Sequence, residues 1–307
     1  MASTSHALLA MERRQPRILL FGSKGQVGFE LARTLARLGD VEEVDRARLD
    51  LTDFNAVRRA VRDAAPEVIV NAAAYTQVEK AESERVLAFR INGEAPEVLA
   101  AEAARSKALL VHFSTDYVFD GSETRPYRED DVTDPGTAYG ASKLAGDIAI
   151  LGSDASAYIF RVAWVYSRRG HNFLNTISRL ARERDQLRVV ADQHGSPTCA
   201  TAIADATTLA IDQWLTSRRA DKPSPPRGVY HMSSPDHTTW HAFAEAIVAR
   251  MDLPEGQPRP RVIPISSSEY PSQVARPLWT VLDSRKLLEK FGLALAPWKS
   301  QLAQCGA

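Results

Sequence analysis

A buried strand that leads directly into a glycine-rich turn and then into a helix is the feature that most constrains the fold of this chain. Residues 18–21 are apolar, as in a buried strand, and the turn follows as Gly22-Ser-Lys-Gly25-Gln-Val-Gly28. Apolar side chains then recur at helical spacing, at Val27, Leu31, Leu35 and Leu38. Glycines at such a turn let a diphosphate approach the backbone, and the helix N-terminus offers free N–H groups to that anion. The segment therefore predicts a dinucleotide-binding unit built around Gly22, Gly25, Gln26, Val27 and Gly28.

An acidic residue closes the second predicted strand, Val41-Glu-Glu-Val-Asp45, about 20 residues after the glycine turn. The glycines follow a G-x-x-G-x-x-G spacing rather than the usual fingerprint, so the position of this acid matters to the prediction. A carboxylate here accepts a hydrogen bond from a ribose 2′-hydroxyl, which favours NADH. The adjacent Arg46 is suited to the 2′-phosphate of NADPH. The sequence thus predicts a pyridine nucleotide and leaves NADH and NADPH as alternatives.

Strands and helices alternate along the first half of the chain. Helices are expected over residues 53–64 and 95–106, and strands over 67–74, 108–114 and 157–164. This order predicts an α/β fold, a Rossmann-like doubly wound parallel sheet. The small side chains of Ala72, Ala73 and Ala74 would let a cofactor lie against the backbone at the carboxyl end of that sheet.

The second half of the chain predicts a smaller C-terminal substrate-binding lobe. Helices are expected over 172–184, 202–215 and 239–251, strands over 187–190 and 228–233, and a strand followed by a helix over 277–292. We assign residues 17–164 to an NAD(P)-binding domain, with 199–230 packing back on it. The lobe comprises 165–198 and 231–303. Residues 1–16 lack the ordered regions of a signal peptide and are predicted to be a disordered extension.

Charge and cysteine content narrow the class of protein. The 38 basic and 38 acidic residues balance, and the pI is about 7.1, which argues against nucleic acid or a membrane surface as a partner. No apolar run approaches the roughly 20 residues of a membrane span. Cys199 and Cys305 are far apart in sequence and lack metal-ligand spacing, so no metal site is predicted and a reducing, cytoplasmic location is expected.

Three residues are ordered as a carbonyl reductase requires: Thr115, Tyr139 and Lys143. A tyrosine hydroxyl can give its proton to the alkoxide that forms when hydride reaches a ketone, but a free phenol titrates near about 10. An ammonium one helical turn away would lower that pKa by favouring the phenolate. Thr115 would hold the substrate carbonyl. The pattern predicts hydride chemistry with Tyr139 as the proton donor.

These segments together resemble the extended short-chain dehydrogenase/reductase superfamily and, within it, the family of dTDP-4-dehydrorhamnose reductases. The resemblance covers residues 17 to about 300, and the matching segments are residues 20–30, 70–82, 114–121, 164–166, 172–173, 192–198 and 276–277. It implies NADPH- or NADH-dependent reduction of the C4 ketone of dTDP-4-dehydro-β-L-rhamnose. The product, dTDP-L-rhamnose, would supply cell-surface polysaccharide such as lipopolysaccharide.

The resemblance also implies roles for individual residues. The catalytic set would be Thr115, Tyr139 and Lys143. The cofactor set would comprise Gly22, Gly25, Gln26, Val27, Gly28, Asp45, Arg46, Asp50, Leu51, Ala72, Ala73, Ala74, Tyr139 and Lys143. The sugar nucleotide would meet Thr115, Asp116, Trp164, Asn172 and Arg276, the last through its diphosphate, because a planar guanidinium suits that anion.

Related activities stay open as alternatives. A sugar-nucleotide dehydratase would carry a Glu where Tyr117 follows Asp116, and the Tyr-Val-Phe run fits a reductase better than an epimerase. Another sugar-nucleotide 4-ketoreductase, or a non-catalytic nucleotide-binding regulatory subunit, would share the fold. Some family members form magnesium-bridged dimers through glutamates. Glu30 matches one such position but Thr201 replaces another, so we expect no bound magnesium and a monomer or weak homodimer.

Overall fold

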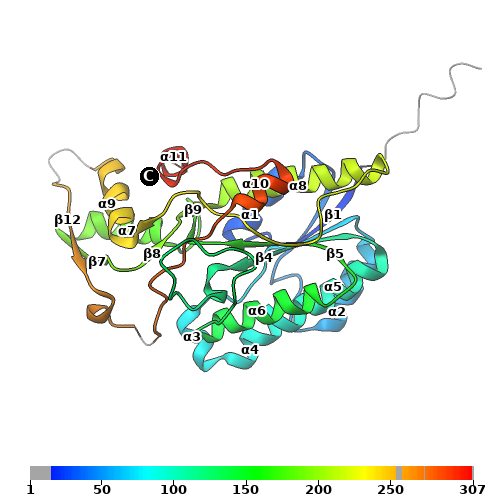
Figure 1. Ribbon diagram of the computed structural model, residues 1–307, viewed down its shortest axis with the longest axis horizontal. Coiled ribbons are helices and arrows are strands. Elements are labelled where there is room, and N and C mark those ends of the chain that lie inside the picture. The colour runs from blue at the N-terminus through cyan, green and yellow to red at the C-terminus, as the bar shows by residue number, and fades with distance from the viewer. Residues whose placement is uncertain (1–14, 254–257, 273, 306–307) are drawn as a thin grey trace, which may run out of the picture.

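A parallel sheet lies between two layers of helices, and a smaller lobe extends from one end of it (Figure 1). The computed structural model describes residues 15–253, 258–272 and 274–305. Of the extension predicted over residues 1–16, the first fourteen lie outside the described residues. Pro16 is buried, and its carbonyl accepts the Asp40 N–H at 2.9 Å, so the folded domain begins before residue 17.

The main sheet contains six strands in the described part of the chain, in the order β10-β5-β4-β3-β1-β2, and every pair is parallel. The strands are β1 (Arg17–Phe21), β2 (Asp40–Val44), β3 (Val68–Asn71), β4 (Leu109–Thr115), β5 (Ser156–Val162) and β10 (Gly228–His231). The chain passes from β1 to β2 on one side and then returns to place β3 on the other. This reversal creates a topological switch point at the carboxyl ends of β1 and β3.

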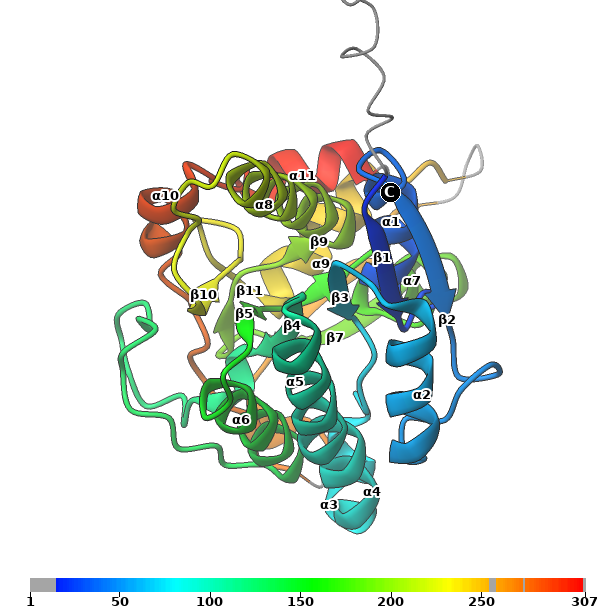
Figure 2. The ribbon, with the colours of Figure 1, turned by 90° about the vertical axis from the view of Figure 1, so that its right-hand side faces the viewer.

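Helices cover both faces of the sheet, which explains why its central strands are apolar in successive residues. One face carries α2 (Phe54–Ala64), α5 (Ala95–Ser106) and α6 (Ala138–Leu151), and the other carries α1 (Gln26–Leu35) and α8 (Ala200–Arg219) (Figure 2). Within β1, Ile18 and Leu20 pack with the α1 and α8 side chains, whereas Leu19 and Phe21 pack with the α2 and α5 side chains. The predicted doubly wound Rossmann-like sheet is confirmed.

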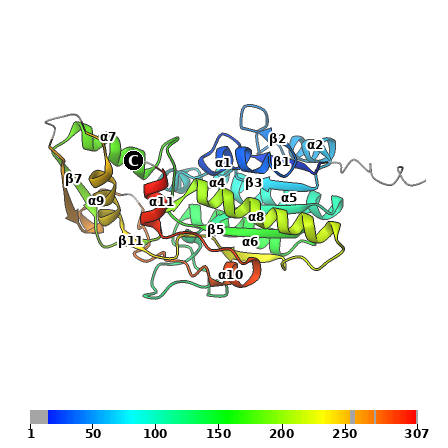
Figure 3. The ribbon, with the colours of Figure 1, turned by 90° about the horizontal axis from the view of Figure 1, so that it is seen from above.

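The smaller lobe gathers at one end of the molecule, seen at the left of Figures 1 and 3. Its helices are α7 (Phe173–Glu183), α9 (Trp240–Arg250) and α11 (Trp298–Cys305). Its short strands pair as β7 (Gln186–Val190) with β12 (Arg261–Ile265), β8 (His194–Gly195) with β11 (Thr238–Thr239), and β6 (Val165–Tyr166) with β9 (Thr198–Cys199). An apolar core of its own, which includes Tyr166, Phe243 and Trp298, holds these elements together.

Several elements differ from the sequence-based expectation. The strand expected near the start of 277–292 is reduced to two isolated bridges, and only α10 (Arg285–Phe291) forms there. The short helices α3 (Val78–Ser83) and α4 (Arg85–Phe89) and the π-helical turn over Arg90–Glu94 were not predicted, nor were β12 and α11. None of the helices in the described ranges combines the length and apolar character needed to span a membrane.

The turn between β1 and α1 depends on two glycines. Gly22 has φ +79°, and a Cβ there would lie 2.6 Å from the backbone nitrogen of Ala73. A Cβ on Gly28 would lie 2.0 Å from the carbonyl oxygen of Gly22. Because both contacts are with backbone atoms, no side-chain rotation relieves them. The first turn of α1 can therefore approach the ends of β1 and β3 only with glycine at these positions.

We predict that Gly28→Ala destabilises the folded chain by about 2 kcal/mol or more, because the added methyl forces the turn away from Gly22. Gly136→Ala is the matched control, because a Cβ at Gly136 meets nothing within 4 Å. Urea denaturation of both variants provides the comparison. Equal free energies of unfolding for the two variants would contradict this account of the turn.

Candidate active site

The predicted cofactor residues surround the topological switch point. The backbone N–H of Ala72 donates to the Phe21 carbonyl at 3.0 Å, which brings the turn after β3 against the turn after β1. Gly25 precedes α1 and makes no side-chain cap to it, so the N–H groups of the first helical turn face outward at this edge. Ala72 and Ala73 are half-buried and Ala74 is exposed. A narrow backbone-lined cradle of this kind fits the diphosphate of a dinucleotide.

The acidic candidates of the cofactor set are partly engaged with their own loops. The Asp45 Oδ1 accepts N–H groups from Ala47 and Arg48, each at 3.0 Å, while Arg46 is exposed beside it. Asp50 accepts both the N–H and the hydroxyl of Thr52 at 2.9 Å, and these bonds hold its pKa below the usual range. Leu51 is buried in the core between the sheet and α2 and α5. Each predicted contact with a cofactor stays a prediction.

Gln26 joins the glycine turn to the beginning of the smaller lobe. Its Oε1 accepts the Ser167 hydroxyl at 2.9 Å and the Asn172 side-chain N–H at 2.8 Å. Asn172 also caps α7, because its Oδ1 accepts the Asn175 N–H at 3.0 Å. The Asn172 side chain is thus bound by protein groups, and its predicted contact with substrate is untested.

The three predicted catalytic side chains converge where β4 ends and α6 begins. Thr115 is the last residue of β4 and is buried. Thr137 caps α6 by accepting the Gly140 N–H at 3.0 Å, which places Tyr139 in the first turn and Lys143 one turn later. The Thr115 hydroxyl interacts with the Tyr139 phenol. The Lys143 Nζ donates to the Phe113 carbonyl at 2.6 Å and lies 3.0 Å from the His112 Nε2.

Burial changes the pKa of Tyr139 and that of Lys143 in opposite directions. It raises the pKa of the Tyr139 phenol above its usual value, and a hydrogen bond with Thr115 offsets only part of that rise. Burial lowers the pKa of the Lys143 ammonium to about 8, although the Asp147 carboxylate acts in the opposite direction. The net shift of the Tyr139 pKa is therefore upward, because desolvation of the phenolate is the largest effect. The expected lowering of that pKa by Lys143 stays a prediction.

Asp116 lies next to the catalytic threonine and is fully buried. The Thr115 hydroxyl donates to its Oδ1 at 2.9 Å. Burial raises the pKa of Asp116 to about 6, although the hydroxyls of Thr280 and Thr115 lower it in part. When Asp116 is ionised, the single hydroxyl proton of Thr115 is committed to it, and the threonine oxygen faces its other neighbours as an acceptor. While Asp116 is ionised, Thr115 therefore has no free proton to donate to a substrate carbonyl, as was predicted for it.

Trp164 stands at the passage from the sheet to the smaller lobe. It has φ +44°, an unusual value for a bulky residue, and its ring stacks on Trp240 of α9 with centroids 3.4 Å apart. A Cβ on Gly195 would lie 2.2 Å from the Trp164 ring, so glycine there gives the indole its place. A strained, half-buried aromatic between the two parts of the fold is consistent with the predicted sugar-nucleotide site.

Arg276 approaches the catalytic residues from the C-terminal part of the chain. Its Nη2 lies 3.3 Å from the Glu79 Oε1, so Arg276 forms a salt bridge with Glu79 in this structure. The Tyr117 ring lies edge-on to Tyr139 with centroids 5.7 Å apart, and burial raises the Tyr117 pKa to about 12 while Arg276 lowers it in part. Arg276 therefore lies near Tyr117, which packs against Tyr139, and its predicted contact with a diphosphate is untested.

Sequence reasoning missed several neighbours of the site. His112 is hydrogen-bonded to Lys143, and Asn71 is hydrogen-bonded to His112. Trp240 stacks on Trp164, and Glu79 forms a salt bridge with Arg276. Asn71 and His112 lie in adjacent, registered positions of β3 and β4. Polar residues inside two apolar strands were a signal that could have identified this pair, whereas nothing local marks Trp240 or Glu79.

Within the described ranges, no three His, Cys, Asp or Glu side chains lie close enough together to hold a metal ion. The Glu30 side chain, 13% exposed, pairs with Arg33 at 2.6 Å, and Thr201 is exposed at the start of α8. The predicted lack of magnesium stays a prediction.

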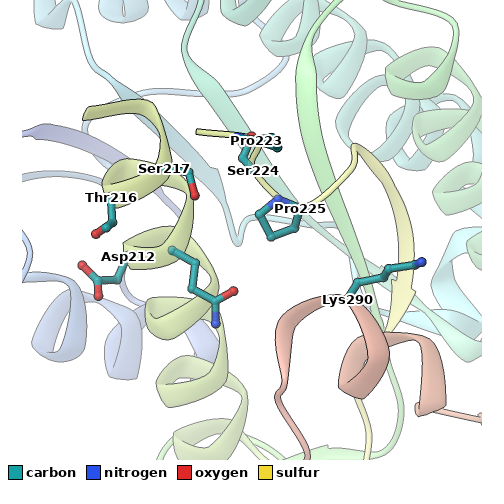
Figure 4. A pocket seen from close by; sticks show the side chains of 8 residues that line it. Asp212, Thr216, Ser217, Pro223, Ser224, Pro225 and Lys290 are labelled. Atoms are coloured by element: carbon teal, nitrogen blue, oxygen red, sulfur yellow. The ribbon is translucent and has the colours of Figure 1, made fainter. Parts of the chain in front are cut away.

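The cavity in Figure 4 lies away from these residues, between α8, α10 and the loop over residues 222–227, which contains three prolines. It measures about 530 Å³. Its lining consists of Asp212, Gln213, Thr216, Ser217, Pro223, Ser224, Pro225 and Lys290. None of these residues belongs to the predicted site, so we assign the cavity no part in catalysis.

The fold, the glycine turn at its switch point and the Tyr139–Lys143 pair on α6 define an extended short-chain dehydrogenase/reductase. The sequence profile of the RmlD substrate binding domain family matches residues 16–307, and the chain belongs to that family. The resemblance seen in the sequence is thereby confirmed.

Named relatives agree with this assignment. The dTDP-4-dehydrorhamnose reductase of Burkholderia thailandensis is 47% identical over 292 residues, which cover 94% of this chain and 97% of the relative. The enzyme of that name from Escherichia coli K12 is 40% identical, with 92% and 94% covered. A crystal structure of the Bacillus anthracis dTDP-4-dehydrorhamnose reductase in complex with NADP superposes with a TM-score of 0.84 at 32% identity, covering 94% of this chain and 98% of that one.

Asp116→Asn is expected to stabilise the protein in a pH-dependent way. The folded-state pKa of Asp116 is raised, so the native protein retains a proton that the unfolded chain releases, and stability falls as pH rises from about 4 to about 6. Removing the charge should add about 2 to 3 kcal/mol near pH 8 and almost nothing near pH 3. Urea titrations of both proteins at the two pH values measure this difference. A gain that is equal at both values would show that Asp116 ionisation costs no stability.

Proposed function

We propose that this chain is an NAD(P)H-dependent reductase that converts the C4 ketone of dTDP-4-dehydro-β-L-rhamnose to the alcohol of dTDP-L-rhamnose. The observation that carries the proposal is that Thr115, at the end of β4, meets Tyr139 in the first turn of α6, with Lys143 one turn later on the same helix. The names of the two relatives described above support the choice of substrate. The product would serve the synthesis of surface polysaccharide.

The residues of this chain perform distinct tasks in that reaction. A bound NAD(P)H supplies the hydride. Gly22, Gly25 and the first turn of α1 would hold its diphosphate. Tyr139 gives its proton to the oxygen that becomes the C4 hydroxyl, and its raised pKa keeps the phenol protonated before the transfer. Lys143, protonated below its pKa of about 8, stabilises the phenolate that remains.

Tyr117 favours reduction over the elimination of water. Dehydratases of this superfamily are expected to carry a carboxylate after the Thr-Asp pair, whereas here Tyr117 occupies that position and packs edge-on against Tyr139. A phenol whose pKa is raised to about 12 cannot act as the base that removes a ring proton at neutral pH.

The decisive experiment incubates the protein with dTDP-4-dehydro-β-L-rhamnose and either NADH or NADPH. Loss of cofactor absorbance with formation of dTDP-L-rhamnose supports the proposal, and recovery of the unreduced ketone with unchanged cofactor contradicts it.

The proposed working form is a monomer or weak homodimer in the cytoplasm that needs no magnesium. The neutral Thr201 side chain offers no carboxylate to a shared cation, and Glu30 is already paired with Arg33. Magnesium binds several oxygen ligands in near-octahedral geometry, which these two positions do not provide. Proton donation by a phenol also makes a Lewis acid unnecessary for this reduction.

Tyr139→Phe should lower kcat by about 10²- to 10⁴-fold, because the variant lacks the proton that completes ketone reduction. The dissociation constant of the cofactor should change little, since the ring and its packing are retained. Stopped-flow turnover and fluorescence titration with NADPH measure the two quantities. A variant that keeps near wild-type kcat would refute the assigned role.

Asp45 and Arg46 should act in opposite directions on cofactor choice. The carboxylate accepts a ribose 2′-hydroxyl and repels a 2′-phosphate, whereas the guanidinium attracts that phosphate. Asp45→Ala should therefore raise the ratio of kcat/KM for NADPH to that for NADH, and Arg46→Ala should lower it, each by about tenfold. If neither substitution moves the ratio, these residues do not contact the ribose.

A further inference from the structure

A buried hydrogen-bond chain runs from the predicted cofactor turn to the catalytic lysine. The Ala73 N–H donates to the Asn71 Oδ1 at 3.2 Å. The Asn71 Nδ2 lies 3.1 Å from the His112 Nδ1, and the His112 Nε2 lies 3.0 Å from the Lys143 Nζ. Asn71, His112 and Lys143 are each at most 2% exposed. The three side chains come from β3, β4 and α6. The series of hydrogen bonds therefore runs across two neighbouring strands and into the helix that carries Tyr139.

The fixed donor at one end determines the direction of every bond in this chain. A backbone N–H can only donate, so Asn71 presents its oxygen to Ala73 and its amide N–H to His112. The His112 Nδ1 must then accept, which leaves the proton of the neutral imidazole on Nε2, facing Lys143. The Lys143 nitrogen therefore accepts a hydrogen bond from the His112 Nε2–H. A neutral amine can accept such a bond, whereas an ammonium cannot.

Protonation of Lys143 therefore requires a change along the whole chain. An ammonium needs the His112 Nε2 as an acceptor, so the imidazole proton must move to Nδ1. Asn71 must then turn its oxygen toward His112, and the hydrogen bond to Ala73 is lost. The charge of Lys143 is in this way linked to the backbone of the turn predicted to meet the cofactor.

We propose that Asn71 and His112 are positioning residues that fix the Lys143 amine and couple its protonation to the hydrogen bond at Ala73. The Phe113 carbonyl, 2.6 Å from the same nitrogen, completes the fixation. Together these partners fix the position of the Lys143 Nζ one helical turn from Tyr139. The role of this coupling in catalysis rests on the proposed reductase function.

The other charged groups around Lys143 do not oppose this assignment. Asp147, one turn further along α6, favours the ammonium, but its Oδ2 is already shared by the Ser114 hydroxyl at 2.9 Å and the Arg161 guanidinium at 3.3 Å. Asp116 lies beyond Tyr139 and raises the pKa of the phenol rather than that of the lysine. The pKa of His112 lies well below its ordinary value because of burial and Lys143, so the ring stays neutral and acts through its tautomers.

The pH dependence of kcat distinguishes positioning from a purely structural role. In His112→Gln, the glutamine oxygen accepts from the ammonium without any change of tautomer. The alkaline limb of the kcat–pH profile follows loss of the Lys143 proton. We expect the apparent pKa of that limb to rise by about one unit. His231→Gln is the matched control, because His231 is equally buried on β10 and its Nδ1 contacts the Tyr127 carbonyl instead. An unchanged alkaline limb in folded His112→Gln would overturn the proposal.

Asn71→Asp tests the other end of the chain. A carboxylate accepts from Ala73 and from the His112 Nδ1 together, which leaves the His112 Nε2 free to accept from the ammonium. The alkaline limb should rise further than in His112→Gln, because the variant adds a negative charge to the favourable tautomer. A limb that stays in place or falls would contradict the direction of the hydrogen bonds.

Nitrogen NMR of the wild-type protein tests the same coupling without any substitution and without turnover. In protein labelled with ¹⁵N-histidine, two-bond ¹H–¹⁵N correlations show which imidazole nitrogen bears the proton. Between about pH 6 and about pH 10 the His112 signals should stay neutral and pass from the Nδ1–H to the Nε2–H tautomer as pH rises. One tautomer throughout, or a charged ring, would overturn the proposal. A tautomer change in a protein without reductase activity would instead reject the proposed function and leave the hydrogen-bond chain standing.

Discussion

The close approach of two backbone turns is the constraint on which the rest of the structure depends. Gly22 lies against Ala73, and Gly28 lies against Gly22, at distances that leave no room for a side-chain carbon. This contact brings the carboxyl ends of β1 and β3 together and directs the N-terminus of α1 at the space above them. A parallel sheet binds ligands at this reversal of strand order. The predicted cofactor site is thus a product of the same packing that closes the fold.

The cradle is also connected mechanically to the smaller lobe. Gln26, in the first turn of α1, holds Ser167 and Asn172, and Asn172 in turn begins α7. The lobe therefore starts from a residue whose neighbours face the predicted diphosphate. Two side-chain hydrogen bonds of Gln26 thus join the glycine turn directly to the segment that begins α7.

Local patterns in the sequence were enough to predict a doubly wound parallel sheet, because apolar runs and glycine turns act within a few residues. The place of Tyr139 and Lys143 on one helix followed from their spacing. What could not be predicted depends on contacts between distant segments. The Trp164–Trp240 stack and the Arg276–Glu79 pair join residues far apart in the chain, and the upward shift of the Tyr139 pKa comes from burial by several elements at once.

Burial has the largest effect on the pKa of Tyr139 and on that of Lys143. A phenol with a raised pKa is a poor base but stays loaded as an acid, whereas a lysine whose pKa lies near 8 exchanges its proton readily near neutral pH. Reduction of a ketone consumes one proton at the alkoxide, so a protonated Tyr139 suits that direction of reaction. In the proposed reaction the phenolate left behind must recover a proton, and Lys143, one turn further along α6, has a pKa low enough to supply one near neutral pH. Under that proposal, the same desolvation would prepare the tyrosine to give a proton and the lysine to replace it.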